Sequence, residues 1–263
     1  MSRAASEAPF LSVEGVGIEF GGVTAIADMT FEVAEGELVS LIGPNGAGKT
    51  TAFNIVTGYL RPSRGAVKFR GRSIAGLKPN EVAALGLVRT FQRTALFESC
   101  TVFENVLIGL HRRTHPTLIG TLLGLPRERR LERELRATAA EILDLIGLVD
   151  QTDAPAASLP YGNQRLLGVA LALAAAPDAL LLDEPVSGMN ASETQRFVEL
   201  VRKLRARGLT ILLVEHDMHM VMGVSDRVVV LNYGRIIANG TPEAIQRDPE
   251  VIRAYLGQGV RHA

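Results

Sequence analysis

The sequence has a single cysteine, no excess of either charge and no long hydrophobic run. Cys100 has no second cysteine for an internal disulfide, so nothing indicates an oxidising compartment. Lysine plus arginine and aspartate plus glutamate both number 28, so the chain lacks the overall positive field typical of nucleic-acid-binding surfaces. The longest apolar run, Leu166 to Ala176, is shorter than the roughly 18 residues that a membrane-spanning helix needs.

These absences leave a soluble globular protein as the expected class. Apolar residues make up 47% of the chain and charged residues 21%, which is ordinary for a protein with a packed core. The N-terminal segment MSRAASEAPF lacks the apolar stretch of a secretory signal. We expect no nucleic-acid partner, and we expect any membrane role to be peripheral, through partner proteins.

Alternating strand and helix patterns predict an α/β fold. Residues 11–42 have the pattern of short strands, and Lys49–Thr57 that of a helix ended by Gly58. Further strands are predicted at Ala66–Phe69, Leu180–Leu182, Thr210–Val214, Arg227–Leu231 and Arg235–Ala238, and further helices at Gly162–Ala176, Ser192–Ala206 and from Pro242 onward. No internal repeat is evident, and no linker marks a second independent domain.

A helical stretch with an arginine-rich face is predicted between Leu110 and Gly147. Apolar residues recur there at spacings of three and four, at Leu131, Leu135, Ala139, Ile142, Ile146 and Val149. The other face carries Arg127, Arg129, Arg130, Arg133 and Arg136 against Glu128, Glu132 and Glu134. A solvated helix face is the favoured interpretation, and a docking surface is the alternative.

Residues 43–50, GPNGAGKT, fit the phosphate-binding P-loop pattern G-x-x-x-x-G-K-[ST]. The segment follows an apolar strand and opens a helix, where backbone N–H groups and the helix dipole attract an anion. The pattern predicts that Lys49 reaches the β and γ phosphates and that Thr50 ligates Mg²⁺. The predicted ATP-binding residues are Gly43, Asn45, Gly46, Ala47, Gly48, Lys49, Thr50 and Thr51.

Two adjacent carboxylates end the apolar strand predicted at Leu180–Leu182. Asp183 is predicted to hold Mg²⁺, and Glu184 to polarise the attacking water as general base. The alternative is an acid pair that only caps the next helix, which would be favoured if the P-loop were absent.

With the segment Leu159-Pro-Tyr-Gly-Asn-Gln164 between them, these two motifs resemble an ATP-binding-cassette (ABC) ATPase, whose signature is usually LSGGQ. The resemblance implies nucleotide contacts from Tyr161, Gly162, Asn163 and Gln164, and stacking of adenine on Phe20. It also identifies Gln92 with the Q-loop glutamine, a catalytic residue and Mg²⁺ ligand, and His216 with the catalytic switch histidine.

The family resemblance implies a P-loop NTPase fold, with a mixed sheet core, an N-terminal antiparallel β subdomain and an α-helical subdomain. The whole chain is then one nucleotide-binding domain. Its helical subdomain spans approximately residues 93–175 with an arginine-rich insertion at 111–136, and a C-terminal extension spans 232–263. ATP would be enclosed in a head-to-tail dimer, between the P-loop of one subunit and the signature of the other.

Several longer segments are similar to the ATPases of branched-chain amino acid importers, namely GLVRTFQ, LFESCTVFENVLIG, DEPVSGMN, LVEHDM and the tail GRIIANGTPEAIQRDPEVIRAYLG. This implies an ATP-hydrolysing subunit that energises uptake of branched-chain amino acids or related small amino acids and amides. The implied partners are two transmembrane permeases, a second ATPase subunit in a hetero- or homodimer and, indirectly, a periplasmic binding protein. The implied location is cytoplasmic, peripheral on the inner face of the cell membrane.

Three residues depart from the family pattern. Pro160 replaces the signature serine, whose lost hydrogen bond predicts slower hydrolysis, and Asn190 replaces an aspartate used between the two ATP sites. Leu171 replaces an arginine and removes a weak surface ion pair.

Three alternative functions remain open from the sequence. Lipopolysaccharide-export ATPases share much of the pattern, but we expect them to lack the arginine-rich insertion. A non-transport ABC protein of DNA repair or translation usually has tandem cassettes or a long coiled coil. A nucleotide-binding regulator that does not hydrolyse ATP is the third.

Overall fold

The computed structural model describes residues 9–90, 96–111 and 126–256. The chain divides into two compact units. The first consists of Met1–Arg89, Asp178–Glu184 and Val201–Ala263, and the second of Thr90–Pro177 and Pro185–Leu200. The predicted phosphate-site residues belong to the first unit and the predicted signature residues to the second.

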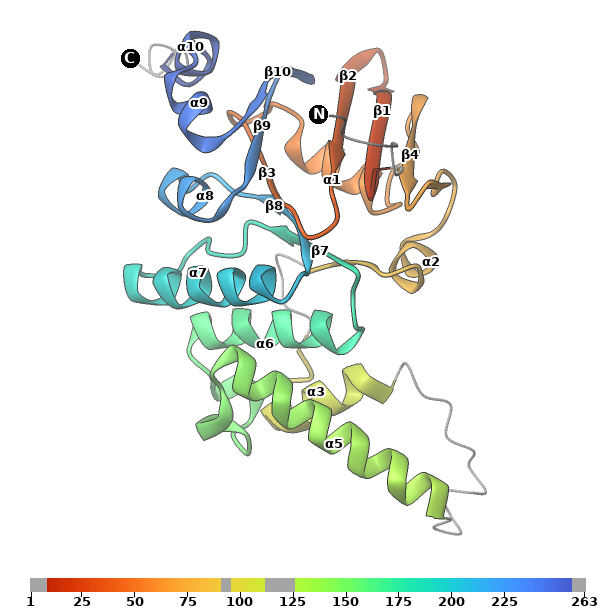
Figure 1. Ribbon diagram of the computed structural model, residues 1–263, viewed down its shortest axis with the longest axis vertical. Helices are drawn as coiled ribbons and strands as arrows, with labels where there is room; N and C mark the ends of the chain where they lie inside the picture. The colour runs from red at the N-terminus through yellow and green to blue at the C-terminus, as the bar shows by residue number, and fades with distance from the viewer. Residues whose placement is uncertain (1–8, 91–95, 112–125, 257–263) are drawn as a thin grey trace, which may run out of the picture. The chain divides into compact units, whose positions relative to one another are not determined.

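Ten described strands of the first unit form a mixed sheet in the order β5-β4-β1-β2-β10-β9-β3-β8-β7-β6 (Figure 1). Their bounds are β1 Leu11–Phe20, β2 Val23–Val33, β3 Leu38–Ile42, β4 Arg64–Phe69, β5 Arg72–Ser73, β6 Leu87–Arg89, β7 Ala179–Asp183, β8 Thr210–Val214, β9 Arg227–Asn232 and β10 Arg235–Gly240. The strands β1, β2, β4 and β5 pair antiparallel, whereas β9, β3, β8, β7 and β6 pair parallel. Every residue of β3, β7 and β8 is buried, which explains their continuous apolar sequences.

Helices of the first unit pack on this sheet. They are α1 (Lys49–Val56), α2 (Pro79–Ala84), α8 (Met218–Val224), α9 (Pro242–Arg247), α10 (Pro249–Leu256) and the last turns of α7 (Ala191–Ala206). The C-terminal helices α9 and α10 place Ile245 and Val251 in one apolar cluster with Ile42 of β3 and Val230 of β9. The C-terminal segment is therefore part of the core that supports the strand before the P-loop.

The second unit is helical. Its helices α3 (Val102–His111), α5 (Pro126–Ile146) and α6 (Tyr161–Ala174) contact one another, as Figure 1 shows, and α7 begins in this unit. The predicted apolar stripe of α5 is buried at Leu135, Ala139, Ile142 and Ile146, with Leu143 beside it. Leu131 is only half-buried, and Val149 lies beyond the helix and is exposed. Short 3₁₀ turns at Val149–Gln151 and Ala156–Ser158 connect α5 to α6.

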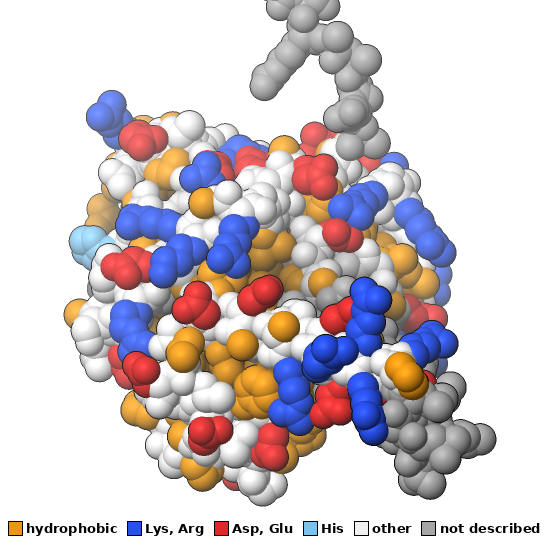
Figure 2. Space-filling model, turned by 60° about the horizontal axis from the view of Figure 1, so that its bottom comes forward, with side chains coloured by type: hydrophobic (Ala, Val, Ile, Leu, Met, Phe, Trp, Pro, Cys, Tyr) orange, Lys and Arg blue, Asp and Glu red, His pale blue; other side chains and the backbone are white. Residues whose placement is uncertain are grey.

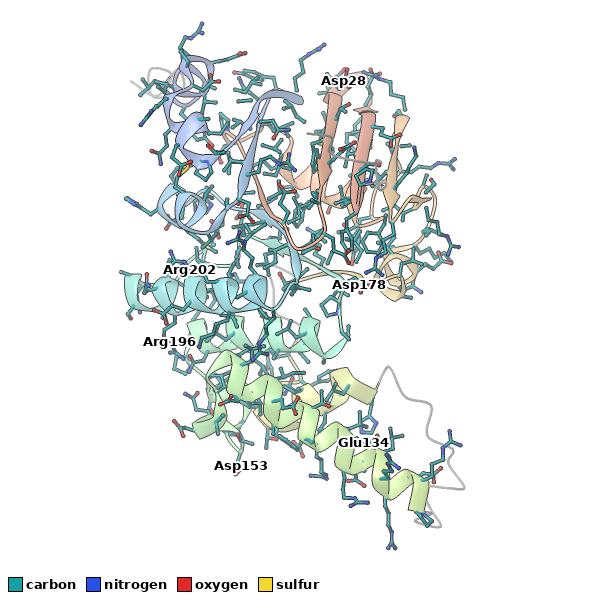
Figure 3. The ribbon with its side chains drawn as sticks, viewed as in Figure 1. Asp28, Glu134, Asp153, Asp178, Arg196 and Arg202 are labelled. Atoms are coloured by element: carbon teal, nitrogen blue, oxygen red, sulfur yellow. The ribbon has the colours of Figure 1, made fainter. Side chains whose placement is uncertain are left out.

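The arginine-rich face of α5 is exposed and internally paired. Arg130 contacts Glu134 (labelled in Figure 3) at 2.8 Å and Arg136 contacts Glu132 at 3.0 Å, both four residues apart along the helix. Figure 2 shows Lys and Arg side chains interspersed with Asp and Glu on one face of the molecule. Such exposed pairs stabilise a helix only weakly, so the contacts agree with a solvated face.

Most predicted elements are confirmed, including the helix that begins at Lys49 and all five later strands. The predicted helical stretch from Leu110 is confirmed over α5, and residues 112–125 lie outside the described part. The strands β5 and β6 and the helices α2, α3 and α8 were not predicted. No helix among the described residues is long and apolar enough to cross a bilayer.

Candidate nucleotide site

The predicted phosphate loop joins the buried strand β3 to helix α1. A Cβ at Gly43 would lie 2.0 Å from the backbone oxygen of Leu231, so only glycine fits where the loop leaves the sheet. Gly48, the residue before α1, has φ +105, and a Cβ there would lie 2.9 Å from the backbone oxygen of Ala25. Close packing against β2 and β9 thus fixes both ends of the loop.

Lys49 is the first residue of α1 and is 92% buried, with 8% of its surface exposed. Its ammonium group donates to the backbone oxygens of Gly43 at 2.7 Å and Pro44 at 3.0 Å, across the loop. Burial lowers the pKa of Lys49 from its ordinary value of 10.5, and the negative charge of Glu184 opposes this shift. Lys49 and Glu184 therefore face a common site from β3–α1 and from the end of β7.

Asp183 and Glu184 stand at the carboxyl end of β7. Asp183 is 3% exposed, and Glu184 adopts φ +44, a left-handed conformation that is rare for a side chain with a Cβ. The backbone N–H of Glu184 donates to Val214 O of β8 at 2.8 Å, which holds this conformation. Backbone strain of this kind persists where the surrounding structure enforces it, and it is typical of functional sites.

The residues present fit a bound Mg²⁺ ion. Asp183 Oδ1 is buried and has no hydrogen-bond partner among the described residues, so its lone pairs are available to a cation. Thr50, the second residue of α1, is exposed at the same phosphate loop and offers a hydroxyl oxygen. Hard oxygen ligands of these two types are those that Mg²⁺ prefers.

Arg89 at the end of β6 is a site neighbour that the sequence did not single out. Its guanidinium donates to Asp183 Oδ2 at 2.6 Å and to Asn54 Oδ1 of α1 at 2.7 Å. The Arg89 and Asp183 side chains are only 12% and 2% exposed. The ion pair therefore fixes one oxygen of the carboxylate and leaves Oδ1 unpaired.

Two more predicted residues lie in the first unit. Phe20 ends β1 at a tight Gly21–Gly22 hairpin and is 47% exposed, as an aromatic platform for a base must be. His216 follows β8, its side chain is largely exposed, and its Nδ1 lies 3.7 Å from Glu215 Oε2. Glu215 is fully buried and accepts from the His216 backbone N–H at 2.9 Å, so it holds the start of this segment.

The signature residues begin helix α6 in the second unit. Pro160 is the N-cap residue and supplies no side-chain cap, so the first-turn N–H groups lack the partner that a serine hydroxyl provides. Gly162 is buried, and a Cβ there would lie 2.7 Å from the Glu193 carboxylate of α7. A larger residue here would therefore have to displace the Glu193 side chain from the start of α7.

The side chains of the signature are engaged within the second unit. Asn163 is buried, donates to Gln151 Oε1 at 3.0 Å and accepts from Arg196 at 3.3 Å (Arg196 is labelled in Figure 3), and Gln164 donates to Leu159 O at 3.0 Å. In this arrangement Asn163 presents its backbone N–H, and not its amide side chain, at the helix N-terminus. Their contact with nucleotide stays a prediction.

Tyr161 connects the signature to the segment after the acid pair. Its hydroxyl donates to Ser187 O at 3.1 Å and accepts from Arg165 Nε at 2.9 Å. Asn190, at the end of that segment, accepts from the backbone N–H of Glu193 at 3.0 Å, and the Glu193 carboxylate accepts from the Asn190 N–H at 3.0 Å. This reciprocal capping box gives Asn190 a structural role at the start of α7.

Two further predicted features have different outcomes. Leu171 is half-buried on α6 and lies against Gly109 of α3, so this residue contributes packing in place of an ion pair. Gln92 lies outside the described residues, and its role stays a prediction.

Comparison with known proteins agrees with these motifs. Residues 26–187 match the family model described as ABC transporter, and residues 235–261 match that described as branched-chain amino acid ATP-binding cassette transporter. The high-affinity branched-chain amino acid transport ATP-binding protein LivG of Salmonella typhimurium is 46% identical over 251 residues, which cover 95% of this chain and 98% of that protein. A lipopolysaccharide export system ATP-binding protein of Acidithiobacillus ferridurans is 35% identical over 88% of this chain and 90% of its own length.

A solved structure shares the fold. The crystal structure of the ADP conformation of an ATP-binding cassette of an ABC transporter superposes with a TM-score of 0.82 at 31% identity, covering 95% of this chain and 99% of that chain. The matched family models together span the P-loop, the acid pair and the C-terminal helices. The chain therefore belongs to the ABC transporter ATPases, as an ATP-binding subunit of the type found in branched-chain amino acid transporters.

Proposed function

We propose that this chain binds ATP with Mg²⁺ and hydrolyses it to energise uptake of branched-chain amino acids or related small amino acids and amides. The observation that carries the chemistry is the convergence of Lys49, Asp183 and Glu184 beyond the carboxyl ends of the parallel strands β3 and β7, which flank β8. In open α/β sheets, ligands bind at this edge.

The nucleotide itself is bound by residues of the first unit. The phosphates lie on the loop from Gly43 to Thr51, with Lys49 against the β and γ groups, and adenine stacks on Phe20. Mg²⁺ is held by Thr50, Asp183 and Gln92, and when bound it neutralises charge on the β and γ phosphate oxygens.

Hydrolysis then needs a base and a contact to the γ phosphate. Glu184, whose backbone is held in the left-handed conformation, accepts a proton from the attacking water. His216 is exposed and contacts the γ phosphate, so its position reports whether that group is present. Neither residue forms a covalent intermediate.

The second half of each site comes from another subunit. In a head-to-tail dimer, the uncapped N-terminus of α6 with Tyr161, Gly162, Asn163 and Gln164 closes over the γ phosphate bound by the partner. Helical residues of roughly 93–175 then form one subdomain of a single nucleotide-binding domain, and residues 232–263 its C-terminal extension. Closure is transmitted to the membrane subunits through Gln92 and the segment that follows it.

The proposed assembly contains two permeases and a second ATPase subunit, and it receives cargo from a periplasmic binding protein. The chain then sits at the cytoplasmic face of the membrane, as a peripheral subunit. The match of the C-terminal segment to the branched-chain amino acid family supports this cargo class over lipopolysaccharide export, whose ATPase is the more distant relative.

Replacing Glu184 by Gln tests the chemistry. We expect ATP binding to persist and phosphate release to fall by about 10²-fold or more, the usual contribution of a general base. Glu250→Gln, at an exposed carboxylate of α10, is the matched control and retains turnover. Normal turnover in Glu184→Gln would show that another group activates the water.

Affinity purification of the tagged chain from native membranes tests the assembly. Mass spectrometry should identify two permeases and a second ATPase, and proteoliposomes of that complex should import leucine, isoleucine or valine when the binding protein and ATP are supplied. Recovery of lipopolysaccharide-transport proteins, or of no membrane protein, would overturn the importer proposal and leave the ATPase chemistry standing.

A further inference from the structure

Arg89 connects two elements that each supply a predicted Mg²⁺ ligand. Its Nη2 lies 2.6 Å from Asp183 Oδ2 at the end of β7, and its Nη1 lies 2.7 Å from Asn54 Oδ1 and 3.3 Å from Thr57 Oγ1. One guanidinium thus joins the end of a sheet strand to the helix that carries the phosphate loop.

The guanidinium is held in a single orientation. It lies over the ring of Phe53 at 5.4 Å and the ring of Tyr59 at 5.6 Å from their centroids. The Thr57 hydroxyl donates to Phe53 O at 2.7 Å, so its lone pairs are left for Arg89. A planar group with several fixed donors suits this position, and a lysine ammonium would serve only part of it.

The acceptors on α1 lie on the same helix face as Thr50. Asn54 and Thr57 follow Thr50 by four and seven residues, which places all three in one row along the helix. On the strand side, the pair with Arg89 occupies Asp183 Oδ2 and leaves the buried Oδ1 without a partner. Through Asn54 and Thr57, Arg89 therefore connects the helix face that carries Thr50 to the carboxylate of Asp183.

We propose that Arg89 is a positioning residue of the nucleotide site, which sets the spacing of Thr50 and Asp183 and holds Asp183 Oδ1 ready for Mg²⁺. The inference rests on the proposed function, in which Thr50 and Asp183 bind that ion. Arg89 itself contacts neither the metal nor the nucleotide. It acts on the ligand, as groups behind a metal ligand commonly do.

The same unit contains a matched arginine away from the site. Arg70 lies over the rings of Phe10 at 5.1 Å and Phe69 at 5.7 Å, and it pairs with Asp178 at 2.9 Å. Its contacts resemble those of Arg89 in kind, but neither ring nor carboxylate belongs to the predicted nucleotide site. Arg70→Met therefore controls for the general loss of a stacked, paired arginine.

The experiment measures how much Mg²⁺ strengthens binding of a fluorescent ADP analogue to the full chain, as the ratio of Kd in EDTA to Kd in Mg²⁺. We expect Arg89→Met to reduce this ratio by about tenfold or more, the usual effect of losing a group that orients a metal ligand, with Kd in EDTA unchanged. Arg89→Lys should retain part of the wild-type ratio, and the control Arg70→Met should retain the full ratio.

Two further variants make each outcome decisive. Asp183→Asn should abolish the Mg²⁺ effect; if it does not, the metal assignment in the proposed function fails, whatever Arg89 does. If Asp183→Asn abolishes the effect and Arg89→Met retains it, or if Arg89→Met weakens binding equally in EDTA, the positioning role is wrong. Should Arg89→Met not fold, Asn54→Ala, which keeps the ion pair and removes one acceptor, must lower the ratio for the inference to stand.

Discussion

Lys49 is a buried cation, and the proposed function places it against the phosphates of the nucleotide. Burial lowers its pKa from 10.5, whereas the negative charge of Glu184 opposes the shift and favours the charged form. Glu184 is also in an unfavourable state, because its backbone has a left-handed φ of +44. Burial disfavours the charge of Lys49 and the backbone of Glu184 is strained, and both residues have proposed roles at the phosphates.

The lowered pKa of Lys49 gives a pH dependence of stability with a definite sign. Between the folded pKa and 10.5 the unfolded chain binds the proton and the folded chain does not, so the free energy of unfolding from this group rises with pH. Wild type should therefore gain stability relative to Lys49→Met as the pH rises toward 10.5, in urea unfolding without nucleotide. Lys203→Met, at an exposed position of α7, should show no such change; an equal change in both variants would contradict the prediction.

Pro160 predicts a gain of function by a single substitution. Its backbone, at φ −54 and ψ 151, is compatible with serine, whose hydroxyl at the N-cap can bond a first-turn N–H or the γ phosphate. A hydrogen bond to a charged group contributes about 1.5 to 3 kcal/mol, so we expect Pro160→Ser to release phosphate roughly tenfold faster. Pro160→Ala, which removes the ring without adding a hydroxyl, separates the two effects, and equal rates for Ser and Ala would refute the role of the hydroxyl.

At the scale of elements, the local sequence was sufficient to predict a helix or strand that has its own apolar pattern or end signal. The buried strands β3, β7 and β8 have continuous apolar sequences, and α1 begins directly after the glycines of the phosphate loop. All four elements were therefore predicted. The strand β6 has only three residues and exists through its pairing with β7, which no local period reveals. Helix α8 did have a signal, the N-cap Asp217, whose side chain accepts from Met220 N.

In the site, too, local motifs were predicted from the sequence, whereas contacts between distant residues were not. The P-loop and the acid pair are contiguous in sequence and were recognised from their motifs. Arg89 and Asp183 are 94 residues apart, and they meet only because β6 pairs with β7. The role of Asn190 was read from the sequence as a lost charge, while the structure adds its capping of α7, a contact that also depends on Glu193 three residues later.

Helix α10 yields a prediction about the C-terminal segment. Val251 is 5% exposed in the cluster with Ile42 and Val230, whereas the next residue, Ile252, is 42% exposed. We expect Val251→Ala to lower the free energy of unfolding by about 1 to 3 kcal/mol, because it removes buried apolar surface under the strand that leads to the P-loop. Ile252→Ala should change it by less than about 0.5 kcal/mol in the same denaturant titration. Equal effects would mean that α10 does not contribute to the core.

At the scale of the whole molecule, the division of the chain has a functional meaning. The predicted phosphate-site residues Lys49, Asp183 and Glu184 lie in the first unit, and the predicted signature at the start of α6 lies in the second. In the proposed head-to-tail dimer, such a chain would supply two different halves to a shared site. In a symmetric dimer, each subunit then gives its P-loop to one site and its signature to the other.

Site sharing can be tested by mixing two inactive variants. Lys49→Met disables the P-loop, and Pro160→Asp keeps a favourable N-cap while placing a negative charge where the γ phosphate must approach the helix. Random mixing of equal amounts makes half the dimers heterodimers with one intact site each, so about a quarter of the wild-type phosphate release should return. A mixture no more active than its parts would contradict sharing between copies of this chain. If wild type hydrolyses ATP only beside a different ATPase subunit, the same two variants, each paired with that subunit, should each leave one site of the two intact.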